Sequence, residues 1–231
     1  LVSGADATGF LRPLTYHAEG RQTETRAWDN AISVTDATAI ATVESLANAS
    51  GTSTISQTVY DLAGRVTTRR EAVGTAEQAV TQYAYNALDQ LVRVTDPRNY
   101  NSYLYYDGAG RQIVSRDAED YVTETSYTPF GEVASITRRA NKATNAAAIV
   151  VLPVFTPDPA KDATTSFEYD QLGQLVKTTD AMGFYESYTL NAFGDRISVR
   201  NKLAGITTNS FDRRGLLLSE TLPMSSTDSA G

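Results

Sequence analysis

The sequence predicts an all-β protein in which tandem β-hairpin repeats of about 21 residues form a long curved antiparallel sheet. Three observations lead to this fold class. A glycine recurs at a fixed interval, an aromatic residue precedes it by four positions, and the flanking segments alternate polar and apolar residues. A segment that recurs at a fixed spacing is a structural unit that stacks on copies of itself, so the repeat is considered before any other fold.

The glycine of the repeat defines the register. Most successive marks lie 21 residues apart, one interval is 25 and another is 42, and Asp89 takes the place of the glycine in one copy. The expected turn glycines are Gly20, Gly64, Gly110, Gly131, Gly173, Gly194 and Gly215.

The aromatic position of the repeat predicts cross-strand ladders. Large rings on neighbouring hairpins stabilise a sheet by packing against one another. One copy has the aliphatic Leu190, and the expected ladder aromatics are Tyr16, Tyr60, Tyr85, Tyr106, Tyr127, Tyr169 and Phe211.

Each half of the unit has a local structural reason. A carboxylate after the aromatic bonds its own backbone and begins a turn, which we expect of Asp61, Asp107 and Asp170, and glycine supplies the positive φ that ends it. The flanks, such as residues 81–85, are rich in Tyr, Thr and Val, as strands are. A second mark, Asp-x-x-x-aromatic, begins ten residues before the aromatic position of the repeat and occurs at Asp6/Phe10, Asp96/Tyr100, Asp117/Tyr121 and Asp180/Phe184. One repeat is therefore a hairpin plus the turn to the next.

The repeats predict one β-sheet region over residues 1–220. Residues 27–56 break the register, and within them Ala39–Ala49 favours a short helix and an irregular strand equally. Residues 139–163 are a non-repeat insert in which Ile149–Leu152 could form a strand and the prolines favour a loop. Residues 221–231 are expected to form a flexible tail.

Composition excludes several classes of protein. A hydrophobic fraction of 41% with 20% charged residues is ordinary for a folded chain. The net charge of −7 argues against a nucleic-acid partner, which needs clustered Lys and Arg. The absence of Cys excludes disulfides and thiolate metal sites, and no apolar run is long enough for a membrane span. Because the sequence begins at Leu1 and carries no signal peptide, we expect it to be a piece of a longer chain.

The repeat resembles the RHS/YD-repeat family, and the residues that carry the resemblance are Tyr60–Arg65, Tyr106–Arg111 and Tyr169–Gln174. This family includes bacterial Rhs proteins, the shell subunits of insecticidal toxin complexes and the teneurins. The resemblance implies a sheet that spirals into a hollow shell, which often encloses a toxic C-terminal polypeptide. It also implies a protein secreted or exported by a bacterium, whose partners are the remainder of the parent polypeptide and an enclosed toxin or cargo segment.

Physical reasoning supports a wall independently of the resemblance. Eight hairpins are about sixteen strands, which at about 4.8 Å each give a sheet roughly 75 Å wide, and open sheets rarely exceed about ten strands without curling. Strand positions such as Thr67, Arg93 and Lys177 are polar, which suits a wall with solvent or cargo on both sides. A fragment of such a wall would expose sheet edges, where self-association is possible.

Candidate sites of chemistry are better explained as parts of turns. His17, the only histidine, follows an aromatic in a turn motif, and no spacing brings a Ser and an acid to it. The acidic run Asp117–Asp120 lacks the spacing of a calcium loop. Asp96–Pro97 and Asp158–Pro159 lack the context of the Asp-Pro bond at which some shells of this family cut themselves, and Asn48–Ser50 is a chance glycosylation sequon.

The sequence therefore predicts a non-catalytic fragment of an RHS/YD-repeat shell, with no metal and no cofactor, that encapsulates a cargo polypeptide. An alternative is a carbohydrate- or protein-binding module that uses the outer β-surface. For that role an aromatic outside the register, such as Trp28, is the best candidate for a contact. An enzyme with paired carboxylates is not supported, because no carboxylates outside the repeat stand at a defensible spacing.

Overall fold

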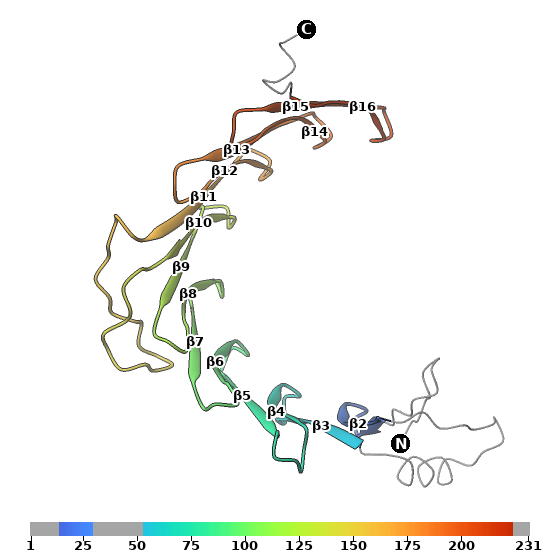
Figure 1. The fold of residues 1–231 in the computed structure, drawn as a ribbon, viewed down its shortest axis with the longest axis vertical. Helices are drawn as coiled ribbons and strands as arrows, with labels where there is room; N and C mark the ends of the chain where they lie inside the picture. Colours follow the sequence, from blue (N-terminus) through green and yellow to red (C-terminus); the bar gives the residue numbers. More distant parts are fainter. Residues whose placement is uncertain (1–13, 30–52, 224–231) are drawn as a thin grey trace, which may run out of the picture. The chain divides into compact units, whose positions relative to one another are not determined.

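A computed structural model describes residues 14–29 and 53–223 of the chain. These residues form sixteen β-strands and no helix, and the strands follow one another in the sheet in sequence order (Figure 1). The predicted all-β architecture of tandem hairpins is therefore confirmed. The expectations for Asp6/Phe10, for Ala39–Ala49, for the sequon at residues 48–50 and for the tail beyond residue 223 lie outside the described residues.

Contacts divide the chain into two compact units, Leu1–Ser102 and Tyr103–Gly231. The strands of the first unit are β1 (Leu14–Tyr16), β2 (Gln22–Trp28), β3 (Ser53–Tyr60), β4 (Val66–Glu71), β5 (Ala79–Tyr85) and β6 (Leu91–Thr95). Strand β7 (Asn101–Tyr106) begins at the boundary. The second unit continues with β8 (Gln112–Arg116), β9 (Val122–Tyr127), β10 (Val133–Arg138), β11 (Ala163–Tyr169), β12 (Leu175–Thr179), β13 (Tyr185–Leu190), β14 (Arg196–Arg200), β15 (Ile206–Phe211) and β16 (Leu217–Thr221).

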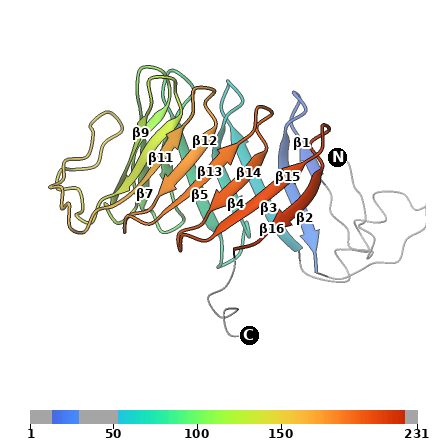
Figure 2. The same ribbon diagram turned by 90° about the horizontal axis from the view of Figure 1, so that it is seen from above.

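Each hairpin has a shift of register beside the residue in the aromatic position. In the β3–β4 hairpin, Tyr60 lies opposite Val66 but Val59 lies opposite Thr68, so Thr67 is an extra residue on the returning strand. The β11–β12 and β13–β14 hairpins have the same irregularity at Tyr169 and Leu190. Such a bulge fixes the register of the hairpin and increases the local twist of its strands. Figure 2 shows the strands of each unit lying side by side.

Most described strand residues in both units are only partly buried, and few apolar side chains are buried. Among the described residues of the first unit, the buried apolar ones are Trp28 and Val92. In the second unit Tyr103, Tyr105, Val114 and Val122 form one cluster on β7, β8 and β9. A sheet with so little core on its faces differs from a sandwich, in which the inner face of every strand is covered.

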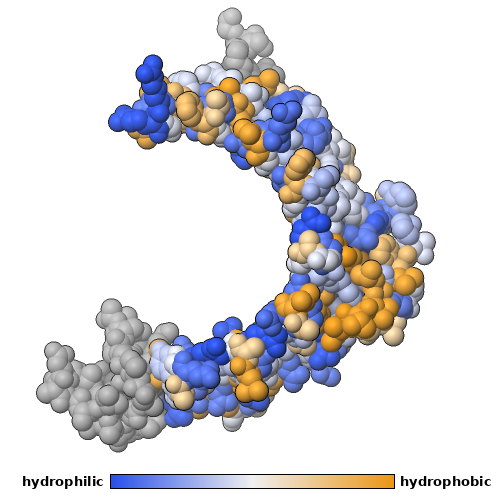
Figure 3. Space-filling model, turned by 180° about the vertical axis from the view of Figure 1, so that it is seen from behind, coloured by the Kyte–Doolittle hydropathy of each residue, from blue (hydrophilic) through white to orange (hydrophobic). Residues whose placement is uncertain are grey.

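The insert between β10 and β11 covers the cluster of the second unit. Its residues Ala143, Ala147, Ile149 and Phe155 pack against the four buried side chains, so the insert supplies the second layer that this part of the sheet needs. The strand considered for Ile149–Leu152 is reduced to a single bridge between Ala148 and Val151. Figure 3 shows hydrophobic residues gathered over this insert.

Candidate functional site

The turn after the aromatic is held by one side chain. In the β7–β8 turn, Oδ1 of Asp107 accepts hydrogen bonds from the N–H groups of Ala109 and Arg111, both at 2.9 Å. The N–H of Gly110 donates to the backbone carbonyl of Asp107 at 3.0 Å, and Gly110 has a φ of 82°. The carboxylate thereby satisfies two backbone donors that a tight turn would otherwise leave unpaired.

The same turn occurs with other acceptors: His17, which the sequence already places in a turn motif, and Thr128, which it does not single out. Nδ1 of His17 accepts from the N–H of Glu19 at 2.9 Å, and Oγ1 of Thr128 accepts from the N–H of Glu132 at 3.2 Å. Both side chains therefore replace the usual carboxylate. Their position within the repeat could have indicated this role, because His17 and Thr128 each directly follow a tyrosine of the aromatic position.

The turns at the opposite ends of the strands have the same geometry. Oδ1 of Asp96 accepts from the N–H groups of Arg98 and Tyr100, and Asn99 has a φ of 68°. The equivalent turns begin at Asp117, Asp180 and Asn201. Four connections between hairpins thus repeat the five-residue turn found within the hairpins, which explains the second mark in the sequence.

The turn carboxylates of Asp61, Asp107 and Asp180 are stabilised in their ionised form. Backbone N–H donation by Arg111, together with its guanidinium, lowers the pKa of Asp107, and Arg65 acts in the same way on Asp61. The Lys202 ammonium, 2.8 Å from Oδ2 of Asp180, is the main cause of the lowered pKa of that carboxyl. Hydrogen bonds to the charged form are the common cause.

We expect acid to destabilise the protein through these turns. A carboxyl with a lowered pKa in the folded protein binds its proton more readily in the unfolded chain, whose ordinary value is 3.8. The stabilisation is then fully present above about pH 5 and is lost as the pH falls through 3.8 toward the folded value. The urea midpoint should be lower at pH 3.5 than at pH 6.5. Asp107→Asn, which keeps the Oδ1 acceptor but does not titrate, should reduce the difference; equal midpoints for the natural chain would contradict this account.

Tyrosine hydroxyls link four of the hairpins to the one before. The hydroxyl of Tyr127 donates to the carbonyl of Gln112 at 2.8 Å, and that of Tyr169 donates to the carbonyl of Val133 at 3.0 Å. In each case the acceptor is the second residue after the glycine position of the preceding hairpin. The other members of this series are Tyr60 to Gln22 and Tyr85 to Val66, both at 2.9 Å.

We call the contact between one hairpin and the preceding hairpin a junction. The residue after the turn glycine also takes part in this contact. The guanidinium of Arg111 lies over the ring of Tyr127 at 4.5 Å, and that of Arg65 lies over the ring of Tyr85 at 4.9 Å, as cation–π pairs. In a later junction the same position is occupied by Gln174, whose Nε2 would lie 2.8 Å from a Cβ added to Gly194. We infer that this side chain and the absent Cβ of the next glycine fit together.

Tyr127→Phe should weaken one junction without changing its shape. The ring, and with it the cation–π pair, is retained, but the carbonyl of Gln112 loses its donor. We expect a loss of about 1 kcal/mol in the free energy of unfolding, measured by urea denaturation. Phe211→Tyr makes the reverse change, since it adds a hydroxyl to a ring that lacks one. At that junction the carbonyl of Arg196 accepts a hydrogen bond from Nδ2 of Asn209 and not from a tyrosine hydroxyl. An unchanged midpoint for Tyr127→Phe would show that water replaces the hydroxyl at no cost.

Polar contacts fix the insert on the sheet. The hydroxyl of Tyr105 donates to the carbonyl of Ala148 at 2.9 Å, and Nη1 of the buried Arg116 donates to the carbonyl of Asn145 at 3.0 Å. At the end of the insert, Arg139 pairs with Glu124 and, at 2.7 Å, with Asp162. The insert is therefore bound to the repeats at several points along its length.

Two carboxylates of the acidic run at Asp117–Asp120 make contacts within the structure. Oδ1 of Asp117 accepts two backbone hydrogen bonds of its turn, and Oδ1 of Asp120 accepts from Nε of Arg116 at 2.8 Å. Among residues 14–29 and 53–223 there is no group of three or more acidic or histidine side chains that could hold a metal ion. The same residues contain no helix long and apolar enough to cross a membrane.

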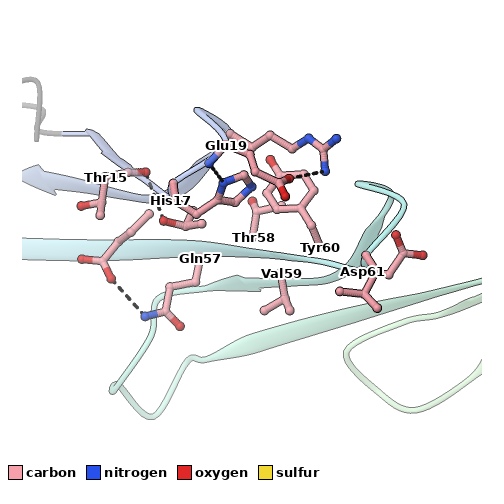
Figure 4. A pocket seen from close by; sticks show the side chains of 13 residues that line it. Thr15, His17, Glu19, Gln57, Thr58, Val59, Tyr60 and Asp61 are labelled. Atoms are coloured by element: carbon pink, nitrogen blue, oxygen red, sulfur yellow. Dashed lines mark hydrogen bonds and ion pairs between the residues drawn. The ribbon is translucent and has the colours of Figure 1, made fainter.

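A pocket lies in the first unit, where β1, β2 and β3 meet, and has a volume of about 570 Å³ (Figure 4). His17 meets the ring of Tyr60 edge-on with centroids 5.7 Å apart, and the guanidinium of Arg21 lies 5.9 Å from that ring. Nε2 of Gln57 donates to Glu24 at 3.1 Å. The aromatic ring of this pocket is thus already in contact with two protein groups.

The other candidates also lie within ordinary structure. Trp28 is 5% exposed at the end of β2, with Arg26 over its ring at 5.7 Å, so it is not an open surface aromatic. Asp96–Pro97 begins a repeat turn. In Asp158–Pro159, the carboxylate of Asp158 accepts from the N–H of Ala160 and pairs with Lys161.

Comparisons with known proteins identify the repeat. Residues 60–100 match the family model described as RHS Repeat, which confirms the recognition of that repeat. A comparison with curated proteins found no match. Solved structures share the fold: the Photorhabdus luminescens Tc holotoxin pore is similar with a TM-score of 0.64 and 16% identity, over 94% of this chain and 11% of that one. TcdB2-TccC3 without its hypervariable C-terminal region is similar with a TM-score of 0.64 and 15% identity, over 95% and 12%. This chain thus spans about an eighth or less of the chains that it matches.

Proposed function

We propose, from the RHS repeat that residues 60–100 carry, that this chain is a non-catalytic segment of a shell wall and that the complete wall encloses a cargo polypeptide, in particular a toxin domain. The solved structures that share its fold belong to Tc toxin assemblies. The turn residues and ladder aromatics predicted from the sequence would then have a mechanical role. They would hold successive hairpins at a constant offset so that the wall can extend.

The observation that carries this proposal is the recurrence of one junction along the chain. A tyrosine hydroxyl bonds the preceding hairpin at Tyr60, Tyr85, Tyr127 and Tyr169 with nearly the same length. An enzyme gathers its functional side chains at one active site, whereas these tyrosine hydroxyl bonds recur along the chain. Along most of the sheet the strands are only partly buried, which suits a partition with polar contents on each side.

Small-angle scattering with analytical ultracentrifugation at several concentrations tests the wall role. A compact domain of 231 residues would have a radius of gyration of roughly 17 Å. A monomer of this chain should have a clearly larger value, because its hairpins add in one direction. A compact monomer at about 17 Å would contradict the proposal.

The alternative, a carbohydrate- or protein-binding module, is tested on the same material with a glycan array and a pull-down. In the pocket beside Tyr60, His17 and Arg21 already contact the aromatic ring. We therefore expect no saturable glycan binding. Saturable binding that is lost in Tyr60→Ala would favour the binding module over the passive wall.

A further inference from the structure

Two cationic side chains of the second unit flank one tyrosine from the two neighbouring strands. Nζ of Lys177, on β12, lies 5.1 Å from the ring centroid of Tyr185, and Cζ of Arg200, on β14, lies 4.1 Å from it. Tyr185 belongs to β13, which pairs with both of those strands. A cation–π contact uses the face of the ring and leaves most N–H donors of the cation unused.

The pairing of the three strands places a serine directly between the two cations. Ser187 lies opposite Lys177 in the β12–β13 pair and opposite Arg200 in the β13–β14 pair, so the three residues form one row across the sheet. Residues opposite each other project from the same face, and so does Tyr185, two positions before Ser187. Because serine is short, its hydroxyl lies between two longer side chains. We call these four residues the cationic row.

The donors of the cationic row have few acceptors. Among residues 14–29 and 53–223, the guanidinium of Arg200 has no hydrogen-bond acceptor and no carboxylate partner, and the hydroxyls of Ser187 and Tyr185 have no hydrogen bond. Lys177 donates to Oε1 of Glu168 at 2.7 Å, and that glutamate side chain is 58% exposed. All four residues of the row are only partly buried, so their donors are open to solvent.

Another copy of the repeat shows the same arginine with its charge satisfied. Arg116 and Arg200 occupy one repeat position, six residues after the turn glycine. Nε of Arg116 donates to Oδ1 of Asp120 at 2.8 Å, whereas the residue four positions after Arg200 is Ala204. Asp120 and Ala204 are themselves equivalent, since each ends its turn with a positive φ, 74° and 66°. Arg200 therefore has the backbone setting of Arg116 without its carboxylate.

The residue opposite the arginine also differs between these two copies. Arg116 lies opposite Tyr103, a buried ring in the cluster that the insert covers. Arg200 lies opposite Ser187, which is short and only partly buried. The same place in the repeat is thus filled and covered in one copy and open to solvent in the other.

We propose that the cationic row binds the phosphate monoester of a small polar molecule. Its donors come from three adjacent strands, and a phosphate monoester offers three terminal oxygens around one centre, whereas a carboxylate offers two in a plane. The charge of such a group, about −1.5 to −2 at pH 7, suits two cations. The outer residues of the row are two strand spacings, roughly 10 Å, apart at their Cα atoms, which leaves room for an oxyanion bonded at about 2.8 Å on each side.

The surroundings of the row favour a soluble ligand over a lipid headgroup. Thr179 lies opposite Tyr185, and Thr189, two positions after Ser187, lies opposite Ser198. These three hydroxyls project from the face that carries the row and can bond the hydroxyls of a sugar phosphate. The net charge of −7 opposes approach of the whole chain to an anionic membrane. The proposal concerns a ligand and does not depend on the wall role.

NMR spectroscopy of the chain labelled with ¹⁵N-tyrosine tests the proposal. The 13 tyrosines give one amide signal each, and Tyr185→Phe identifies the signal of Tyr185. Glucose 6-phosphate is titrated at constant ionic strength and pH 7.5, where the ester is mostly a dianion, and glucose serves as the control. We expect a saturable shift of the Tyr185 signal with the ester and none with glucose. The absence of a saturable shift with the ester would overturn the proposal.

Three variants locate the site. Arg200→Gln should raise the Kd at least about fivefold, because it removes charge-assisted hydrogen bonds. Glu168→Gln should lower the Kd about twofold, because it releases the ammonium of Lys177. The matched control is Arg138→Gln, which removes an exposed arginine of β10 that has no ion pair among the described residues, and it should leave the Kd unchanged.

The variants also give the results that would contradict the site. Equal Kd values for Arg200→Gln and Arg138→Gln would overturn it. A Kd that rises in Glu168→Gln would contradict the role of Lys177. Because misfolding does not increase affinity, Glu168→Gln keeps the test decisive even if Arg200→Gln fails to fold.

Vesicles distinguish the two sources of a phosphate monoester. Phosphatidylcholine vesicles that contain phosphatidic acid, whose headgroup is a phosphate monoester, should not sediment with the chain. Sedimentation with these vesicles that Arg200→Gln abolishes, without any response to glucose 6-phosphate, would overturn the assignment to a soluble ligand. A compact particle in the scattering experiment would refute the wall role and leave this site unaffected, so the two proposals fail separately.

Discussion

Tyr105→Ala should destabilise the second unit by about 3–5 kcal/mol, the largest loss that we expect from a single substitution in this protein. Tyr105 is 5% exposed and belongs to the cluster that the insert covers. Its removal leaves a cavity beneath Ile149 and Phe155 and also deprives the carbonyl of Ala148 of its donor. Urea denaturation followed by circular dichroism measures the change.

Two further variants separate the contributions to this result. Tyr105→Phe keeps the ring and removes only the hydroxyl, so it should cost about 1 kcal/mol. Tyr100→Ala, at a site that is 55% exposed, should cost less than either, because little is packed there. Equal losses for Tyr100→Ala and Tyr105→Ala would show that the insert does not cover a core.

Gly110→Val should destabilise its hairpin by about 1–3 kcal/mol. Gly110 has a φ of 82°, a conformation that a β-branched residue adopts only with strain. The strain falls on the β7–β8 turn, which leads directly into the cluster at Val114. Thermal unfolding of the variant against the natural chain measures the effect.

The same turn provides a matched control. Gly108 lies two residues earlier, has no positive φ, and would meet nothing within 4 Å if a Cβ were added. Gly108→Val adds the same side chain in the same turn and should change the melting temperature much less. A similar shift for both variants would contradict the assignment of Gly110 as the residue that ends the turn.

The repeat could be predicted from the sequence because its causes are local. A turn of five residues is determined by a carboxylate that reaches N–H groups two and four positions ahead, and by one residue with a positive φ, so its signature survives in the sequence. The alternation of the flanking segments then gives strands.

Contacts between neighbouring hairpins could not be predicted in the same way. The hydroxyl of Tyr169 bonds Val133 across the whole insert, so no fixed spacing describes the pair. The insert itself has no period, and its apolar residues do not indicate that Ala147, Ile149 and Phe155 face the sheet while Val150 is 89% exposed. Packing decides between these residues, and packing depends on the neighbouring strands.

The local closure of every turn also determines how the protein can be made. Each described strand pairs with a strand next to it in the sequence, so most hairpins are complete once about 21 residues have been synthesised. The chain could therefore fold from its N-terminal end during synthesis, adding one hairpin at a time to an edge that is already formed. The insert follows the three strands that it covers, so its docking surface exists before it emerges. A protein assembled in this order exposes only one growing edge at any moment, which limits the opportunity for aggregation.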